Sequence, residues 1–441
     1  MKHPEQPRPA RPDRRTLVAS TVGTVMEWYD FNLYGLASAL VFGKLFFPTA
    51  SPTVGTLASF ATFAVGFAAR PLGGLIFGSL GDRIGRSKIL LVTMLVMGLS
   101  STLIGALPTY ATIGIWAPIL LVALRVLQGI GVGGEFAGAT LLTIENSPAN
   151  RRGFYGAVPA MGTGAGFVLA SAVFAAVSML PEDALLSWGW RLPFLASIIL
   201  VAFGLVMRRR LGETAEFSAL ERKGAEQRSP LLTTLRKHPG AVIRTMGVTV
   251  SGFVFGYLIQ AFTLAYGTSA LGIDRSTLLW AIALASALEI VTIPMWGALS
   301  DRFGRRTVVV SGLVATALYV FPFFALLETK STALIFVAYI IAIPIVKDWV
   351  FGPQAALVAE MFTTDVRYSG VSTGREFGGA IFGGTAPFIG TALYSATGSI
   401  WPVCVYVMAG AAISVIATLA GRRVVPSDSA DVVAPTVTAN V

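Results

Sequence analysis

The feature that most constrains this chain is a succession of twelve apolar runs, separated by short polar gaps. A helix needs roughly 20 apolar residues to cross the hydrocarbon core of a bilayer, and each run reaches about that length. The runs cover residues 16–44, 54–80, 88–107, 112–144, 153–179, 190–208, 241–269, 276–299, 307–327, 331–361, 369–396 and 399–421. Charged residues make up only 13% of the chain, whereas a soluble domain carries about 25%. The sequence therefore predicts an all-α membrane protein with twelve transmembrane helices.

A basic turn rich in glycine occurs twice, after the second apolar run and again after the eighth. The first copy is GSLGDRIGRSK, residues 78–88, and the second is GALSDRFGRRT, residues 297–307. The pair Glu145 and Arg152 also recurs, as Glu360 and Arg367, with both residues displaced by 215 positions. Such a long period does not indicate a solenoid repeat. It predicts two pseudo-symmetric halves with six helices each, over residues 16–208 and 241–421.

Polar segments flank and join the predicted halves. Residues 1–15 and 422–441 are expected to be disordered cytoplasmic ends, and residues 209–240 to be a cytoplasmic linker with one or two amphipathic helices. Twenty-five of the 33 Lys and Arg residues fall in segments on this side and four on the other, so the positive-inside rule places both termini in the cytoplasm. Trp188 and Trp190 are predicted to anchor the opposite interface.

The charge and the rare residue types narrow the function classes. The net charge of +10 comes from residues in the gaps between apolar runs, which predicts contact with the lipid bilayer and no binding of nucleic acid. Cys404 is the one cysteine, and the two histidines, His3 and His238, lie in polar segments. We therefore expect no metal site and no cofactor, and little chemistry for an enzyme.

Ionisable residues inside the first and fourth runs are candidates for function, because a charge near the bilayer centre is costly unless it is paired or faces water. Glu27 and Asp30 share one face of the first helix, with Tyr34 one turn further on. Arg125, Gln128 and Glu135 form a stripe along the fourth helix. The proton affinity of a buried carboxylate depends on whether an arginine lies beside it. Asp30 and Glu135, with Glu27 in reserve, are therefore predicted to carry a coupled proton.

The second half supplies Glu289, Lys347, Asp348, Arg375 and Glu376 inside its runs. An alternative role for these residues is structural, as internal ion pairs that hold helices in register. A substrate carboxylate would favour Arg, which can bind it in bidentate fashion. The predicted substrate-binding set is Arg125, Gln128, Tyr34, Lys347, Arg375 and Glu376.

Several stretches together resemble the major facilitator superfamily and, within it, the metabolite:proton symporters that include shikimate, α-ketoglutarate, citrate and proline/betaine carriers. They are GTVMEWYDFNLYG (23–35), FAARPLGG (67–74), RVLQGIGVGGEF (125–136), WGWRLPF (188–194) and FGPQAALVAEMFTTDVRYSG (351–370). The resemblance implies a cytoplasmic latch between the halves, formed by Gly78, Asp82, Arg86, Glu145, Arg152, Asp301, Arg305, Glu360 and Arg367. The charged pair Arg375-Glu376 departs from the pattern of these relatives, which puts direct transfer of any relative's substrate in doubt.

The sequence as a whole predicts a monomeric transporter of the cell inner membrane that takes up a small anionic substrate by alternating access. The expected substrate is a shikimate-like or dicarboxylic acid, and the coupling ion a proton. An alternative is a proton symporter for a zwitterionic osmolyte such as proline or a betaine, which the lack of heptads in the tail disfavours. A membrane-embedded enzyme and a transporter-like sensor are further alternatives.

Overall fold

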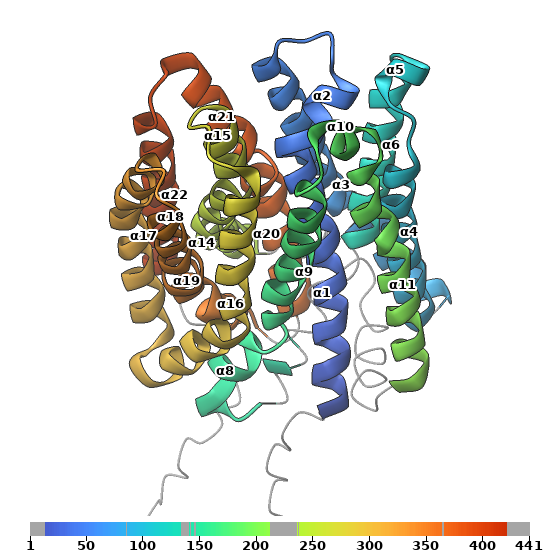
Figure 1. Cartoon of the computed structure of the whole chain (residues 1–441). Coiled ribbons are helices and arrows are strands. Elements are labelled where there is room, and N and C mark those ends of the chain that lie inside the picture. The colour runs from blue at the N-terminus through green and yellow to red at the C-terminus, as the bar shows by residue number, and fades with distance from the viewer. Residues whose placement is uncertain are drawn as a thin grey trace, which may run out of the picture.

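The computed structural model describes residues 14–84, 86–133, 141, 143–144, 147–211, 236, 238–363 and 366–420. Within these residues the helices form twelve successive membrane-length stretches, which stand as two bundles side by side (Figure 1). The order of the stretches along the chain is the predicted one. The predicted amphipathic helices of 209–240 and both terminal segments lie mainly outside the described residues, so the predicted domain boundaries stay a prediction.

The first bundle contains six stretches, several of them built from more than one helix. They are α1 (Arg14–Ala37) with η1 (Ser38–Phe42) and α2 (Gly43–Phe46); α3 (Pro52–Ile84); α4 (Arg86–Ala106); α5 (Tyr110–Ile113) with α6 (Trp116–Val132); η2 (Ala149–Arg151) with α8 (Arg152–Ala157) and α9 (Met161–Ser178); and α10 (Glu182–Ala184) with η3 (Leu185–Gly189) and α11 (Arg191–Leu211).

The second bundle repeats this plan. Its stretches are α14 (Pro239–Tyr257) with η4 (Leu258–Phe262) and α15 (Thr263–Ser269); α16 (Arg275–Phe303); α17 (Arg305–Glu328); α18 (Thr332–Ile340) with η5 (Ile341–Lys347) and α19 (Asp348–Ala359); α20 (Arg367–Gly378) with η6 (Gly379–Gly383) and α21 (Ala386–Thr397); and α22 (Trp401–Ala420).

Helix length and apolar composition suit a bilayer. Among the described residues, seven helical stretches are long and apolar enough to cross a membrane, and residues 182–206, bent by 40°, make an eighth if counted as one span. Large apolar side chains such as Ile199, Val291 and Leu318 are about two-thirds exposed, as expected for surfaces that face lipid. The sixth span begins at Glu182 instead of residue 190 as predicted, because two short helices precede the bend.

Close backbone contacts hold α3 against α6. A Cβ atom at Gly129 would lie 2.1 Å from the carbonyl oxygen of Gly66, and one at Gly133 would lie 1.9 Å from that of Arg70. Any larger residue at these two positions would push the helices apart. Glycine at this crossing allows helix association in a membrane, where packing rather than the hydrophobic effect brings helices together.

The first and seventh spans are both interrupted by a widened, π-helical turn. These turns are η1 and η4, which begin at Ser38 and Leu258, so they recur at nearly the same offset as the glycine-rich basic turns. A further π-helical segment, η5, precedes Lys347 and contains Pro344. Such segments often mark functional sites, and in transporters broken helices line the substrate path.

The two bundles meet mainly along α9 and α16, which pack against each other. We call the end of the molecule that carries α8 the α8 end and the opposite one, which carries α10, the α10 end (Figure 1). The predicted interfacial position of Trp190 is wrong. Its side chain is fully buried in a cluster with Phe42, Phe46 and Phe194, whereas Trp188 is half exposed.

Candidate functional site

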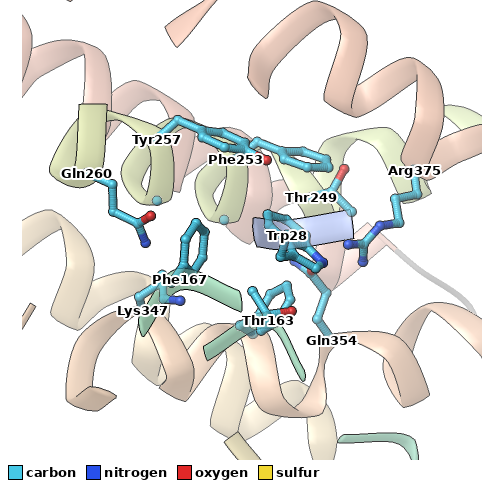
Figure 2. A pocket seen from close by; sticks show the side chains of 13 residues that line it. Trp28, Thr163, Phe167, Thr249, Phe253, Tyr257, Gln260, Lys347, Gln354 and Arg375 are labelled. Atoms are coloured by element: carbon cyan, nitrogen blue, oxygen red, sulfur yellow. The ribbon is translucent and has the colours of Figure 1, made fainter. Parts of the chain in front are cut away.

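A cavity lies between the two bundles (Figure 2). Its lining comes from α1 and α9 in the first bundle and from α14, η4, η5, α19 and α20 in the second. The lining residues are Trp28, Thr163, Phe167, Thr249, Gly252, Phe253, Gly256, Tyr257, Gln260, Lys347, Phe351, Gln354 and Arg375. Pockets of this make-up, mostly apolar with a few polar groups, suit small molecules.

Stacked aromatic rings form one wall of the cavity. The ring of Tyr257 lies between those of Trp28, at 6.3 Å, and Phe253, at 6.4 Å between centroids. Phe167 meets Trp28 at 5.4 Å. Flat walls of this kind bind the apolar faces of a small ring or chain.

Several polar atoms on the cavity wall are buried without a hydrogen-bond partner among the described residues. They are Trp28 Nε1, Tyr257 Oη, Gln260 Oε1 and Thr163 Oγ1. Leaving buried polar groups unpaired costs free energy. A polar substrate in the cavity would satisfy them, so the wall suits a molecule that carries both apolar surface and hydrogen-bonding groups.

Two cations reach the cavity from the second bundle. Lys347, at the end of η5, forms ion pairs with Glu289 of α16 and, at 3.3 Å, with Asp348. The guanidinium carbon of Arg375, in α20, lies 5.9 Å from the ring centre of Phe253. Figure 2 shows Lys347 and Arg375 on different sides of the cavity. Both side chains line the cavity.

Arg125 belongs to a separate cluster inside the first bundle. Its side chain is fully buried, and its guanidinium carbon lies 4.1 Å from the ring centre of Tyr34 and 4.4 Å from that of Phe31. Arg125 donates to Gln128, whose amide donates to Ser101 Oγ at 2.6 Å. No described residue accepts a hydrogen bond from its Nε or Nη2, so these donors can bind a further acceptor.

Asp30 lies next to this arginine cluster. One of its oxygens accepts a hydrogen bond from Ser197 Oγ of α11 at 2.8 Å, and its charge interacts with that of Arg125. A buried carboxylate and a buried guanidinium act on each other over a longer range than they would in water, because few polar atoms screen them.

An ion triad connects the two bundles beside the cavity. Arg70 of α3 donates to Glu27 of α1 at 2.9 Å and to Glu376 of α20 at 2.7 and 3.2 Å. All three side chains are buried. The triad therefore ties α20, in the second bundle, to two helices of the first.

The α8 end is held closed by Asp301, near the end of α16. Its two carboxylate oxygens accept the backbone N–H groups of Gly153 and Phe154, at 2.8 and 2.9 Å. Asp301 also pairs with Arg305 at 3.1 Å, and Arg305 pairs with Glu360. These contacts bring α8 of the first bundle against α16 and α17 of the second.

The remaining predicted latch residues are placed in part. Arg367 begins α20 and donates through Nε to the carbonyl of Ala359 at 3.0 Å. Arg152 begins α8, and Gly78 lies in α3. The side chains of Asp82 and Arg86, and the whole of Glu145 and Glu135, lie outside the described part of the chain.

The α10 end is held closed by different residues. Arg275, the first residue of α16, donates to the carbonyls of Ser178 and Leu180, at 3.0 and 3.1 Å. These carbonyls lie at the C-terminal end of α9 in the first bundle and just after it. Both ends of the contact between the bundles are therefore closed in this structure.

Comparison with known proteins shows the family. Residues 15–248 match the family described as "Sugar (and other) transporter", and residues 244–437 match the "Major Facilitator Superfamily". The chain belongs to the major facilitator superfamily. A shikimate transporter of Escherichia coli K12 is 43% identical over 410 residues, covering 92% of this chain and 94% of that protein. A proline/betaine transporter of Salmonella typhimurium is 36% identical and covers 91% of this chain and 82% of its own length.

Solved structures agree in fold. The partially occluded, inward-open xylose transporter XylE from E. coli matches with a TM-score of 0.67 at 15% identity, over 92% of this chain and 96% of that one. The predicted major facilitator fold is thus confirmed. Because the families and relatives are transporters, this superfamily member is a multi-pass membrane transporter, and the alternative of an enzyme is wrong.

The structure distributes the predicted site residues of this transporter over distinct places. Of the predicted substrate-binding set, Lys347 and Arg375 line the cavity, whereas Arg125, Gln128 and Tyr34 lie in the arginine cluster and Glu376 in the triad. Of the predicted proton carriers, Asp30 lies beside Arg125 and Glu27 in the triad.

Sequence reasoning missed three contributors. Arg70 and Arg275 were not selected, although Arg70 interrupts an apolar run and so carried the signal of a buried charge. The third is the aromatic wall, because nothing in the sequence brings Phe253 and Tyr257 next to the first helix.

Proposed function

We propose that this transporter takes up a small carboxylate together with protons, by alternating access around the central cavity. The observation that carries the proposal is that Lys347 and Arg375 face one cavity with aromatic walls. Charged residues inside a membrane protein are retained where they serve the substrate or ion path. Two cations on one small cavity favour an anion.

The nature of the acid follows from the cavity and the relatives. A shikimate-like ring acid would place its carboxylate on a cation, its hydroxyl groups on Gln260, Tyr257 or Thr163, and its ring against the aromatic wall. A dicarboxylic acid would use both Lys347 and Arg375. The 43% identity to a shikimate transporter supports the first choice.

A zwitterionic osmolyte such as proline or a betaine is the second candidate. The proline/betaine relatives support it, and so does the aromatic wall, because aromatic rings attract quaternary ammonium groups. Such a substrate would have to place its positive group away from both cations, on the Trp28 side of the cavity.

The coupling proton is proposed to bind a buried carboxylate that alternates between partners. Asp30 beside Arg125 fits this role, with Glu27 as a further carrier through its bond to Arg70. Arg125 has donors without an acceptor among the described residues, so a change in the charge of Asp30 would alter the interactions of Arg125 directly. Glu135 stays a prediction for the same role. We propose no metal and no organic cofactor.

The positions of the latch residues support an assignment of the two ends of the molecule to the two sides of the membrane. We propose that the α8 end faces the cytoplasm, since the glycine-rich basic turn at Asp301 lies there, and that both termini lie on this side of the cell inner membrane. The transporter is proposed to work as a monomer, because the cavity is formed within one chain.

Uptake by the purified protein in liposomes tests the function. Liposomes with an acidic exterior are offered labelled shikimate, a dicarboxylate, proline and glycine betaine in turn. We expect accumulation of an acid above its external concentration, collapse of that accumulation when a protonophore is added, and weaker accumulation in Asp30→Asn. Uptake that ignores the pH gradient would contradict proton coupling, and uptake confined to the betaine would favour the second candidate.

A further inference from the structure

A second buried carboxylate cluster lies on the cavity wall, away from Asp30. Glu289 of α16, Lys347 of η5 and Asp348 of α19 form it, and the exposed fraction of both carboxylate side chains is 0%. The cluster holds two carboxylates but one ammonium group. An excess negative charge in a low-dielectric interior is costly, and a bound proton is the smallest ligand that removes it.

The two carboxylates differ in their hydrogen-bond and ion-pair partners. Asp348 Oδ2 accepts a hydrogen bond from Thr292 Oγ1 at 2.6 Å, so Asp348 keeps a partner whatever Lys347 does. Glu289 depends on Lys347 alone, since no described residue donates a hydrogen bond to its Oε2. If Lys347 turned to another anion, Glu289 would be a buried charge without compensation.

Lys347 is placed where its ammonium group can exchange Glu289 for an anion in the cavity. It lines the cavity (Figure 2), and its ammonium nitrogen lies 5.7 Å from the ring centre of Phe167 and 5.5 Å from that of Phe351. It closes the π-helical segment η5. A substrate carboxylate in the cavity therefore competes with Glu289 for the same ammonium group.

Few other groups could neutralise the negative charge of Glu289. Of the described elements packed against α16, α9 carries no titratable side chain. Tyr339 of α18 is hydrogen-bonded to Thr263, and Arg152 and Arg305 lie at the α8 end with Asp301. Lys347 and Asp348 are the charged groups that act on Glu289.

We propose that Glu289 is a proton-binding site of this transporter, which takes up its proton when the substrate carboxylate replaces it at Lys347. The charge balances: one anion and one proton enter, so the cluster together with the bound substrate has the same net charge as the cluster alone. The inference rests on the proposed function in that the substrate is an anion that binds Lys347. It adds a proton carrier in the second bundle to the one proposed at Asp30.

The position of Glu289 links this proton to the contact between the bundles. A Cβ atom at Gly164 of α9 would lie 2.7 Å from Cβ of Glu289 and 3.3 Å from its Oε2. The carboxylate thus lies directly against the first bundle. A change in its charge or rotamer acts on the α9–α16 contact, which must slide for access to alternate.

Transport by Glu289→Gln tests the proposal with the acid that wild type is found to take up. One proton per cycle contributes about tenfold accumulation per unit of pH gradient, so with the membrane potential clamped this variant should accumulate about tenfold less per unit. Lys347 keeps Asp348 as a partner, so the fold should survive. Glu328→Gln, an exposed carboxylate of α17, is the matched control and should behave as wild type. Equal accumulation by Glu289→Gln and wild type would overturn the proposal.

A second measurement needs no substrate. Replacing Lys347 by Gln imitates the loss of its ammonium group to a substrate, and infrared spectra of the purified protein at neutral pH then report protonated carboxyl groups. We expect a new carboxyl band in Lys347→Gln that is absent from Lys347→Gln with Glu289→Gln and retained in Lys347→Gln with Asp348→Asn. A band that persists without Glu289 would overturn the proposal. If wild type takes up none of the acids, the proposed function fails while this result still decides the role of Glu289.

Discussion

The two ends of the contact between the bundles are closed by opposite chemistry. At the α8 end a short acidic side chain, Asp301, accepts the N–H groups of Gly153 and Phe154. At the α10 end a long basic side chain, Arg275, donates to the carbonyls of Ser178 and Leu180. Each charge meets the helix terminus whose partial charge it complements.

The two closures differ in how they are supported. At the α8 end the backbones themselves touch, since a Cβ atom at Gly153 would lie 2.4 Å from the carbonyl oxygen of Gly297. The Asp301 side chain is only 9% exposed and also pairs with Arg305. Arg275 is partly exposed and reaches across to neutral acceptors. The comparison teaches that the α8 end should be the harder one to open.

The largest effect is expected from Asp301→Asn. The asparagine amide presents a donor to one of the two N–H groups and leaves Arg305 without one of its carboxylates. Hydrogen bonds to charged groups contribute roughly 1.5–3 kcal/mol, so the population with an open α8 end should rise by about 10- to 150-fold. Spin labels at Asn150 and Phe303, both exposed, would report the distance across that end.

The control for this variant is Asp183→Asn, an equally conservative change at an exposed residue of α10, which should leave the label distances unchanged. If the α8 end stayed closed in Asp301→Asn, the claim that this carboxylate holds it closed would be refuted.

A smaller effect is expected from Arg275→Gln at the other end. Glutamine keeps a neutral donor near the α9 terminus, and the lost interaction is partly exposed and therefore screened. A loss of about 1 kcal/mol corresponds to about a fivefold rise in the population with an open α10 end. Labels at Met179 and Ala270 measure it. A shift larger than that of Asp301→Asn would reverse the ranking of the two ends.

The smallest effect is expected at the ion pair between Lys44 and Glu182, also at the α10 end. The side chains approach to 2.5 Å, but they are 60% and 55% exposed. Exposed pairs contribute about 0–1 kcal/mol, so Glu182→Gln should change the melting temperature and label distances little, and any change should vanish in high salt. A large shift would show that the α10 end depends on more than Arg275.

The sequence predicted the twelve spans and the two halves because apolar length and the recurring glycine-rich turn are local signals. It did not predict the bend after Glu182 or the π-helical turns, since widening a helix by one residue leaves the apolar pattern nearly unchanged. Trp190 was misplaced for a related reason. A tryptophan near the end of a span suits the interface and an aromatic cluster equally well.

The candidate site was less predictable, because its pairs join residues far apart in the chain. Arg375 and Glu376 adjoin in sequence and suggested one pair, yet Glu376 binds Arg70 of α3. Neighbouring residues on a helix point in directions about 100° apart, so adjacency in sequence does not by itself establish which partner a charged side chain binds. Similarly, the stripe of Arg125 and Gln128 was recognised as functional, but only the packing of α1, α4 and α6 shows that it lies outside the cavity lining.

Both closures belong to one continuous helix, since α16 begins with Arg275 and carries Asp301 in its last turn. Glu289 and its contact with Gly164 lie near the middle of the helix. At a rise of 1.5 Å per residue, Glu289 is about 21 Å from Arg275 and about 18 Å from Asp301 along the helix axis. The contact with Gly164 therefore lies near the midpoint between the two closures, where the helix would pivot. If α16 tilted about this contact, opening one closure would compress the other, and a single rocking motion would not open both ends at once.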